Sequence, residues 1–180
     1  NKSVLSHISG TPLGAIHSLE DNPLSRKPVI SLTVATWFGL GLSPLAPGTV
    51  GTLGGVLLYW WMAALPEWIR IPLILGVIGI SVITAQRAGK WYNEPDSGKI
   101  VVDEVAGYLV GTILVPFSWL NAWILFGLFR LFDITKPPPA NYFDNRMHNG
   151  FGVTMDDVVA GVYSCLVFHL GQWLVRLLWG

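Results

Sequence analysis

The sequence has little charge for its length. Charged residues make up 12% of the 180 positions, whereas about a quarter is typical of a soluble domain. The mean hydropathy is +0.52. The 11 basic and 11 acidic residues balance, so we expect no basic face of the kind that binds nucleic acid. The composition therefore predicts a membrane-associated protein.

The sequence also lacks the residues of several common sites. Its one cysteine, Cys165, lies in an apolar run, which excludes an internal disulfide and favours a core or lipid-facing residue over a catalytic thiol. The four histidines are scattered, so no Cys/His metal site is predicted. Residues 1–28 contain no apolar run typical of a signal peptide. We expect them to form a poorly structured extension to a single domain at 29–180.

Long apolar segments separated by short polar breaks predict an all-α fold. They lack the alternation that is typical of strands, and several tryptophans lie at their ends, as in an interfacial aromatic belt. We expect a membrane-associated helical bundle with about three to four transmembrane segments; alternatively, the segments are buried helices of a bundle that lies partly in the membrane. The segments are 29–42, 50–65, 71–85, 100–115, 119–132 and 158–179.

Basic residues gather in two of the polar breaks. Arg87, Lys90 and Lys99 lie in the first break, and Lys136 and Arg146 lie in the second. Because basic loops tend to remain in the cytoplasm, both breaks are predicted to face that side of the membrane. The acidic residues described next border the same breaks, so their chemistry should be cytoplasmic.

Six of the 11 acidic residues fall within one 55-residue window of this apolar chain. Burying a carboxylate costs several kcal/mol unless a cation or a proton compensates it, so the window predicts a cation site. Oxygen ligands without Cys or His favour a hard cation, above all Mg²⁺. The six candidate metal ligands are Asp103, Glu104, Asp133, Asp144, Asp156 and Asp157.

Both adjacent acidic pairs have a second interpretation. Asp103 and Glu104 lie in an apolar helix, where they reach one ion only at a helix interface, with Gly107 letting a neighbour approach. Alternatively, they are first-turn acids that favour the helix dipole. Asp156 and Asp157 follow Thr154, in the pattern of a capping box. Asp157 is therefore either a ligand or part of a helix cap.

The remaining acids lie beside basic residues. The helix that contains Arg130 and Asp133 must end by Lys136, because Pro137 follows. An acid with two cations at one helix end suits a metal-bound phosphate; alternatively, it is a surface ion pair. Asp144 lies with Arg146 in a polar stretch that has no EF-hand spacing, and its alternative is an ordinary solvated loop.

A loop rich in Gly and Thr precedes the apolar segment 50–65. Thr49 or Thr52 is a candidate helix cap, and Gly48 allows close approach of the backbone. Free N–H groups at such a helix start bind phosphate. The loop is not a P-loop, because it lacks the lysine and the glycine spacing.

Four motifs in this order resemble the phosphatidylglycerophosphatase A family of bacterial membrane phosphatases. They are GLGLSPLAPGTVGT at 39–52, VDEVAG at 102–107, FRLFDITKP at 129–137 and DDVVAG at 156–161. The resemblance covers about 36–179. It implies a helical bundle with a central helix in the bacterial inner membrane. It also implies Mg²⁺-dependent removal of the terminal phosphate of phosphatidylglycerophosphate, which gives phosphatidylglycerol.

The hypothesis for the site is metal-assisted phosphomonoester hydrolysis. Lys136, helped by Arg130 or Arg146, neutralises the phosphoryl oxygens, and Asp144 or Asp156 completes the metal shell or orients water. Two rivals remain. A phosphatidyltransferase is disfavoured because its acid spacing is absent, and a cation channel or transporter is disfavoured by the cations beside Asp133. The expected metal-holding catalytic residues are Asp103, Glu104, Asp133 and Asp157, and the expected phosphate-binding residues include Gly48, Thr49 and Thr52.

Overall fold

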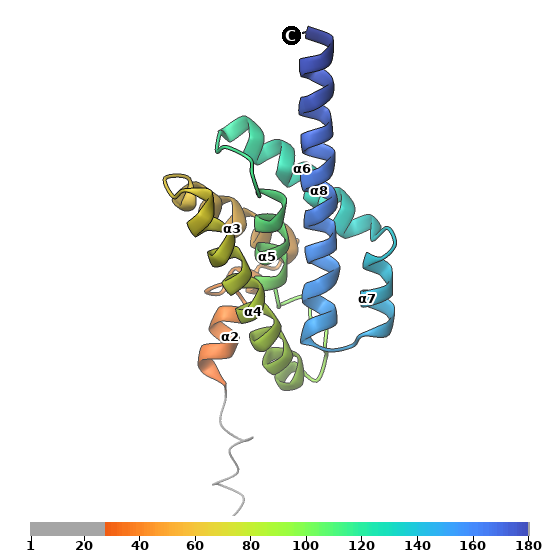
Figure 1. Cartoon of the computed structure of the whole chain (residues 1–180). Helices are drawn as coiled ribbons and strands as arrows, with labels where there is room; N and C mark the ends of the chain where they lie inside the picture. The colour runs from red at the N-terminus through yellow and green to blue at the C-terminus, as the bar shows by residue number, and fades with distance from the viewer. Residues whose placement is uncertain (1–27, 180) are drawn as a thin grey trace, which may run out of the picture.

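The computed structural model describes residues 28–179, and every regular element in them is a helix (Figure 1). The predicted all-α bundle is confirmed. The predicted extension at 1–28 lies outside the described residues except for Pro28. The elements are α2 (Val29–Ala35), the 3-10 helix η1 (Leu40–Leu42), α3 (Pro47–Met62), α4 (Glu67–Tyr92), α5 (Val102–Gly111), α6 (Trp119–Thr135), α7 (Ala140–Arg146) and α8 (Gly150–Trp179).

Helix α5 is the centre of the bundle, with α3, α4, α6 and α8 packed around it (Figure 1). All of its residues are buried except Glu104, which is half-buried. A helix that is apolar on every side is stable only when other elements cover it. Tyr59 of α3 and Phe129 of α6 pack edge-on against Tyr108 of α5. The central helix is therefore held by aromatic contacts on two sides.

Helices α5 and α8 cross at two glycines. A Cβ atom at Gly107 would collide with the carbonyl oxygen of Asp157, and one at Gly161 would collide with the carbonyl oxygen of Gly107. Only glycine lets the two backbones approach this closely. The crossing thus brings the first turn of α5 next to the second turn of α8.

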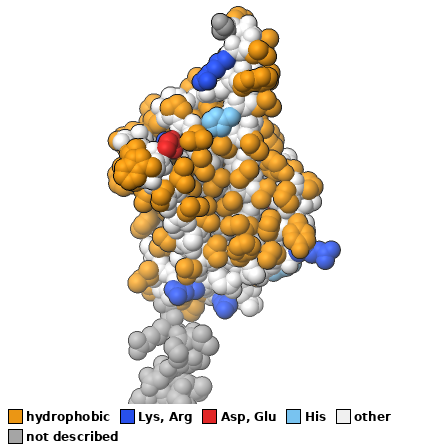
Figure 2. All heavy atoms as spheres, in the orientation of Figure 1, with side chains coloured by type: hydrophobic (Ala, Val, Ile, Leu, Met, Phe, Trp, Pro, Cys, Tyr) orange, Lys and Arg blue, Asp and Glu red, His pale blue; other side chains and the backbone are white. Residues whose placement is uncertain are grey.

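Helices α4 and α8 are long and apolar enough to cross a membrane, by length and composition. Only 28% and 22% of their most apolar windows are buried, whereas a core helix of a soluble protein would be mostly buried. Hydrophobic side chains cover much of the face in Figure 2, and Lys and Arg lie mainly toward its lower end. The sequence predicts three to four transmembrane segments, and those beyond α4 and α8 remain a prediction. The tryptophans that the sequence predicts for an interfacial belt have exposed side chains: Trp60, Trp61, Trp119, Trp173 and Trp179.

The start of α8 differs from the prediction. The helix begins at Gly150, because the side chain of Asn149 accepts a hydrogen bond from the N–H of Gly152 and so caps the helix there. The N–H of Gly150 donates to the side chain of Gln86 on α4. Thr154 therefore lies inside the helix, where its hydroxyl pairs with that of Ser81 at 2.8 Å. The capping-box interpretation of Asp157 is wrong.

Three other local expectations also need correction. Neither Thr49 nor Thr52 caps α3, since Ala46 is its N-cap and provides no side-chain bond; Pro47 starts the helix. The polar break at 66–70, between the predicted segments 50–65 and 71–85, lies mostly within a helix, because α4 already begins at Glu67. Asp144 lies on the short helix α7 rather than in a loop.

Candidate metal and phosphate site

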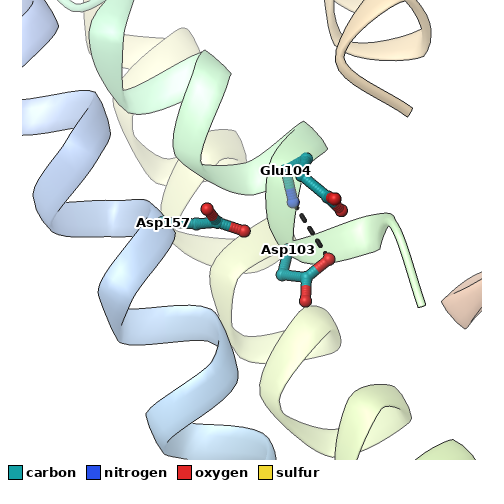
Figure 3. Close-up of side chains that lie close together, drawn as sticks. All are labelled: Asp103, Glu104 and Asp157. Atoms are coloured by element: carbon teal, nitrogen blue, oxygen red, sulfur yellow. Dashed lines mark hydrogen bonds between the residues drawn. The ribbon is translucent and has the colours of Figure 1, made fainter. Parts of the chain in front are cut away.

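Three carboxylates from two helices meet at the centre of the bundle. Asp103 and Glu104 come from the first turn of α5, and Asp157 of α8 points toward them (Figure 3). One oxygen of each lies within 4.8 Å of the others. Asp103 and Asp157 are only 3% and 5% exposed. This set, called the acidic cluster below, has the ligand type and spacing of a divalent-cation site.

One oxygen of the acidic cluster is buried without a partner. Oε2 of Glu104 is shielded from solvent and accepts no hydrogen bond from the described residues. A buried carboxylate oxygen with no donor costs free energy unless a cation or proton compensates it. The residues present therefore fit a bound metal ion.

The electrostatics of α5 lead to the same conclusion. Burial raises the pKa of Glu104 to about 8, against the effect of its hydrogen bond with Asp103, and the nearby carboxylates of Asp157 and Asp133 raise the pKa further. Burial also holds the pKa of Asp103 well above its usual range, and Glu104 is the next cause. Without a cation, the first turn of α5 thus retains protons that a metal ion would displace.

Two cations lie at the rim of the acidic cluster. Arg130 of α6 pairs with Asp133 at 2.5 Å, and Lys136 pairs with Asp156 of α8 at 2.7 Å. Lys136 is the C-cap of α6 and has a left-handed backbone (φ 42°). The helix therefore ends where the sequence predicts. The end of α6 therefore places Lys136 next to Asp156 on α8.

The start of α3 lies against the acidic cluster. A Cβ atom at Gly48 would collide with Oε1 of Glu104 and would lie 3.2 Å from Nη1 of Arg130. No side chain caps α3, so its first N–H groups are free of a side-chain acceptor. Thr49 is half-buried in this turn. Thr52 is buried, and its hydroxyl donates to the carbonyl oxygen of Gly48 at 2.8 Å.

The structure brings most of the predicted site residues together, with two exceptions and one addition. Arg146 is exposed at the end of α7 and, among the described residues, makes no hydrogen bond or ion pair with the acidic cluster. The side chain of Asp144 lies outside what the structure describes. Asp96, absent from the prediction, lies near enough to help raise the pKa of Asp103. Its position shortly before α5 was the only signal for it.

Comparisons with known proteins agree with the resemblance. The family model described as Phosphatidylglycerophosphatase A matches residues 33–172. The chain is 37% identical over 164 residues to the Phosphatidylglycerophosphatase A of Haemophilus influenzae, covering 87% of this chain and 99% of that protein. It is 34% identical over 143 residues to the protein of that name in Escherichia coli, covering 77% and 82%. It is 33% identical over 162 residues to a "Putative phosphatidylinositol-3-phosphatase" of Bacteroides thetaiotaomicron, covering 84% and 99%. No solved structure matches.

Proposed function

The chain belongs to the phosphatidylglycerophosphatase A family, and we propose that it hydrolyses the terminal phosphomonoester of phosphatidylglycerophosphate in a Mg²⁺-dependent reaction. The products are phosphatidylglycerol and phosphate. The family is one of phosphatases, so the chain is an enzyme. The observation that carries the proposal is the acidic cluster with two cations, Arg130 and Lys136, at its rim.

The carboxylates would hold the metal. Asp103, Glu104 and Asp157 supply three oxygens from two rigid helices, and Asp133 and Asp156 lie beside them to complete the shell or orient water. When bound, Mg²⁺ supplies Lewis acidity toward the phosphoryl group and lowers the pKa of a water molecule. The unpartnered Oε2 of Glu104 supports this assignment.

The other residues act on the phosphate. Lys136 and Arg130 neutralise charge that builds up on the phosphoryl oxygens, and the first N–H groups of α3 at Gly48 and Thr49 donate to them. A water oxygen forms the new bond to phosphorus as the bond to the glycerol oxygen breaks. The water loses a proton, and the leaving glycerol oxygen gains one. Asp156, which accepts a hydrogen bond from Lys136, would orient the water.

Two exchangeable ion pairs would link metal binding to phosphate binding. Arg130 is paired with Asp133, and Lys136 is paired with Asp156. If these carboxylates bound a metal ion, each cation would lose one partner and could turn toward the phosphate. The metal would therefore strengthen phosphate binding beyond its own charge.

The proposed location is the bacterial inner membrane, with the site facing the cytoplasm. Helices α4 and α8 would span the bilayer. Arg87 and Lys90 lie in the last turns of α4, next to the segment that leads into α5 and the acidic cluster. Basic residues at this end agree with the positive-inside tendency. Residues 29–180 would form the catalytic domain.

The test is phosphate release by purified protein from phosphatidylglycerophosphate in mixed micelles, after chelation and then with Mg²⁺ added back. We expect release only with the metal. Phosphatidylinositol 3-phosphate serves as a second substrate, because one relative is named for it. Intact protein that releases no phosphate with Mg²⁺ would rule out the proposal. In that case, metal flux in vesicles and headgroup exchange would separate the transporter and transferase rivals.

A further inference from the structure

A polar pocket lies beside the acidic cluster, and we propose that it binds the internal phosphodiester and glycerol of the lipid headgroup. The inference rests on the proposed function and names a subsite of the same substrate. In phosphatidylglycerophosphate, a glycerol joins the terminal phosphomonoester to a phosphodiester that carries the acyl chains. If the monoester lies at the acidic cluster, the phosphodiester needs a cationic partner a short distance away.

The pocket is formed where the loop before α3 faces the segment before α5. Its volume is about 470 Å³, and its lining includes Ser43, Pro47, Glu94, Ser97 and Lys99. The backbone at residue 41, which lines one wall, lies directly against the carbonyl of Lys99 on the other. The two walls are therefore packed against each other, which fixes the shape of the pocket.

The pocket shares both walls with the acidic cluster. Pro47 is the first residue of α3, and the next residue, Gly48, lies against Glu104. On the other wall, Lys99 precedes Asp103 by four residues, so their α-carbons lie at most about 14 Å apart. One headgroup can therefore reach from the acidic cluster into the pocket.

The polar groups of the pocket match a phosphodiester next to a hydroxyl. Lys99 is exposed, and its Nζ lies 5.1 Å from the centre of the Tyr92 ring, a weak contact that leaves its N–H donors available. The buried Ser97 also lines the pocket. Glu94 would repel a bare phosphate, but it can accept a hydrogen bond from the glycerol hydroxyl. One cation with one acceptor suits a monoanionic polyol diester better than a second phosphomonoester.

The edge of the pocket suits a lipid. Leu42 and Pro44 line the pocket, and Phe38, Leu42 and Leu45, in and next to η1, are 75%, 60% and 79% exposed. Residues 28–66 contain no Asp, Glu, Lys, Arg or His. An uncharged loop with exposed apolar side chains belongs at the surface of a bilayer. The acyl chains would leave over this edge while the diester remains at Lys99.

The first test measures binding rather than turnover. The full chain is titrated with glycerophosphoglycerol, a soluble diester headgroup without the terminal phosphate, in the absence of Mg²⁺. We expect saturable binding that Lys99→Ala weakens about tenfold or more, the usual effect of losing one charge-assisted hydrogen bond. Lys90→Ala, which removes a cation at the same end of the molecule but outside the pocket, should bind as the wild type does. No binding by the wild type, or equal binding by Lys99→Ala, overturns the inference.

The second test uses turnover to separate this inference from the proposed function. In micelles with a neutral surface, Lys99→Ala should raise KM for phosphatidylglycerophosphate about tenfold and leave kcat within about twofold, because the diester is bound equally in the ground and transition states. Binding of inorganic phosphate with Mg²⁺ should not change. A fall in kcat with unchanged KM, or the same loss in Lys90→Ala, overturns the subsite. Loss of all turnover in the wild type instead overturns the proposed function and leaves the binding result to decide the subsite.

Discussion

Binding of Mg²⁺ should depend steeply on pH, because Glu104 must lose a proton to become a ligand. Burial raises the pKa of Glu104 to about 8 in the metal-free protein. Below that pH, the metal ion competes with a proton for the carboxylate. Raising the pH toward 8 should therefore strengthen the apparent affinity for Mg²⁺, and lowering it should release the metal.

The size of the effect follows from the pKa of Glu104. With a pKa of about 8, its ionised fraction rises from about one in a hundred at pH 6 to about one half at pH 8. The apparent affinity should thus rise about fifty-fold over this range, or ~2.3 kcal/mol, from this one proton. Asp103, whose pKa is also raised, adds to the slope and makes fifty-fold a lower bound.

Isothermal titration of the purified chain with Mg²⁺ at several pH values would measure this slope and the protons released. Glu104→Gln should bind the metal more weakly, with a flatter pH profile. Glu67→Gln is the matched control, because it removes a carboxylate outside the acidic cluster. Glu67 pairs with Arg70, which donates to the carbonyls of Thr112 and Val115 beyond the other end of α5. This variant should keep the wild-type slope. A Mg²⁺ affinity that does not change between pH 6 and pH 8 would refute the claim that Glu104 loses a proton when it binds the metal.

Three further predictions concern packing, charge and stability. Gly107→Ala should lower the melting temperature by an amount equivalent to about 1–3 kcal/mol, because the new Cβ atom meets the Asp157 carbonyl and Phe129. Gly111→Ala, whose Cβ atom would have its nearest contacts at 3.5 Å, should be tolerated. Equal melting temperatures for the two variants would contradict the tight crossing of α5 and α8. Lys136→Met should lower kcat about 10²–10³-fold, because it removes a group that stabilises charge in the transition state. Lys90→Met should leave kcat unchanged. Equal steady-state rates for the two variants would exclude Lys136 from the site. The metal-free protein should lose stability as pH rises from about 5 to about 8, because the folded state holds the Glu104 proton that the unfolded chain releases near the ordinary glutamate pKa of 4.5. Thermal melts should show this fall, and Mg²⁺ should reverse it. A melting temperature that rises with pH would contradict the raised pKa of Glu104.

The fold class and the acidic character of the site could be predicted from the sequence. Long apolar segments without alternation indicate helices whatever their packing, and six acids in an apolar window indicate a cation. The end of α6 was also predictable, because Pro137 disfavours the helical conformation at Lys136. These features depend on local chemistry alone.

The partners within the site were not predictable, because they depend on how the helices cross. Asp157 meets Asp103 only because Gly107 lets α8 approach α5. The capping box at Thr154 looked valid locally, but Asn149 caps the helix five residues earlier. The salt bridge from Lys136 leads to Asp156, 20 residues along the chain, and no local spacing indicates it.

The central claim is that the three carboxylates of the acidic cluster form one cation site that turnover requires. The most direct measurement is the Mg²⁺-dependent initial rate of phosphate release from phosphatidylglycerophosphate by Asp103→Asn, compared with Glu67→Gln. The account predicts that Asp103→Asn remains folded, loses Mg²⁺ binding and releases phosphate at least about a thousandfold more slowly, while the control stays near the wild-type rate. A folded Asp103→Asn protein with near-normal, Mg²⁺-dependent turnover would contradict it.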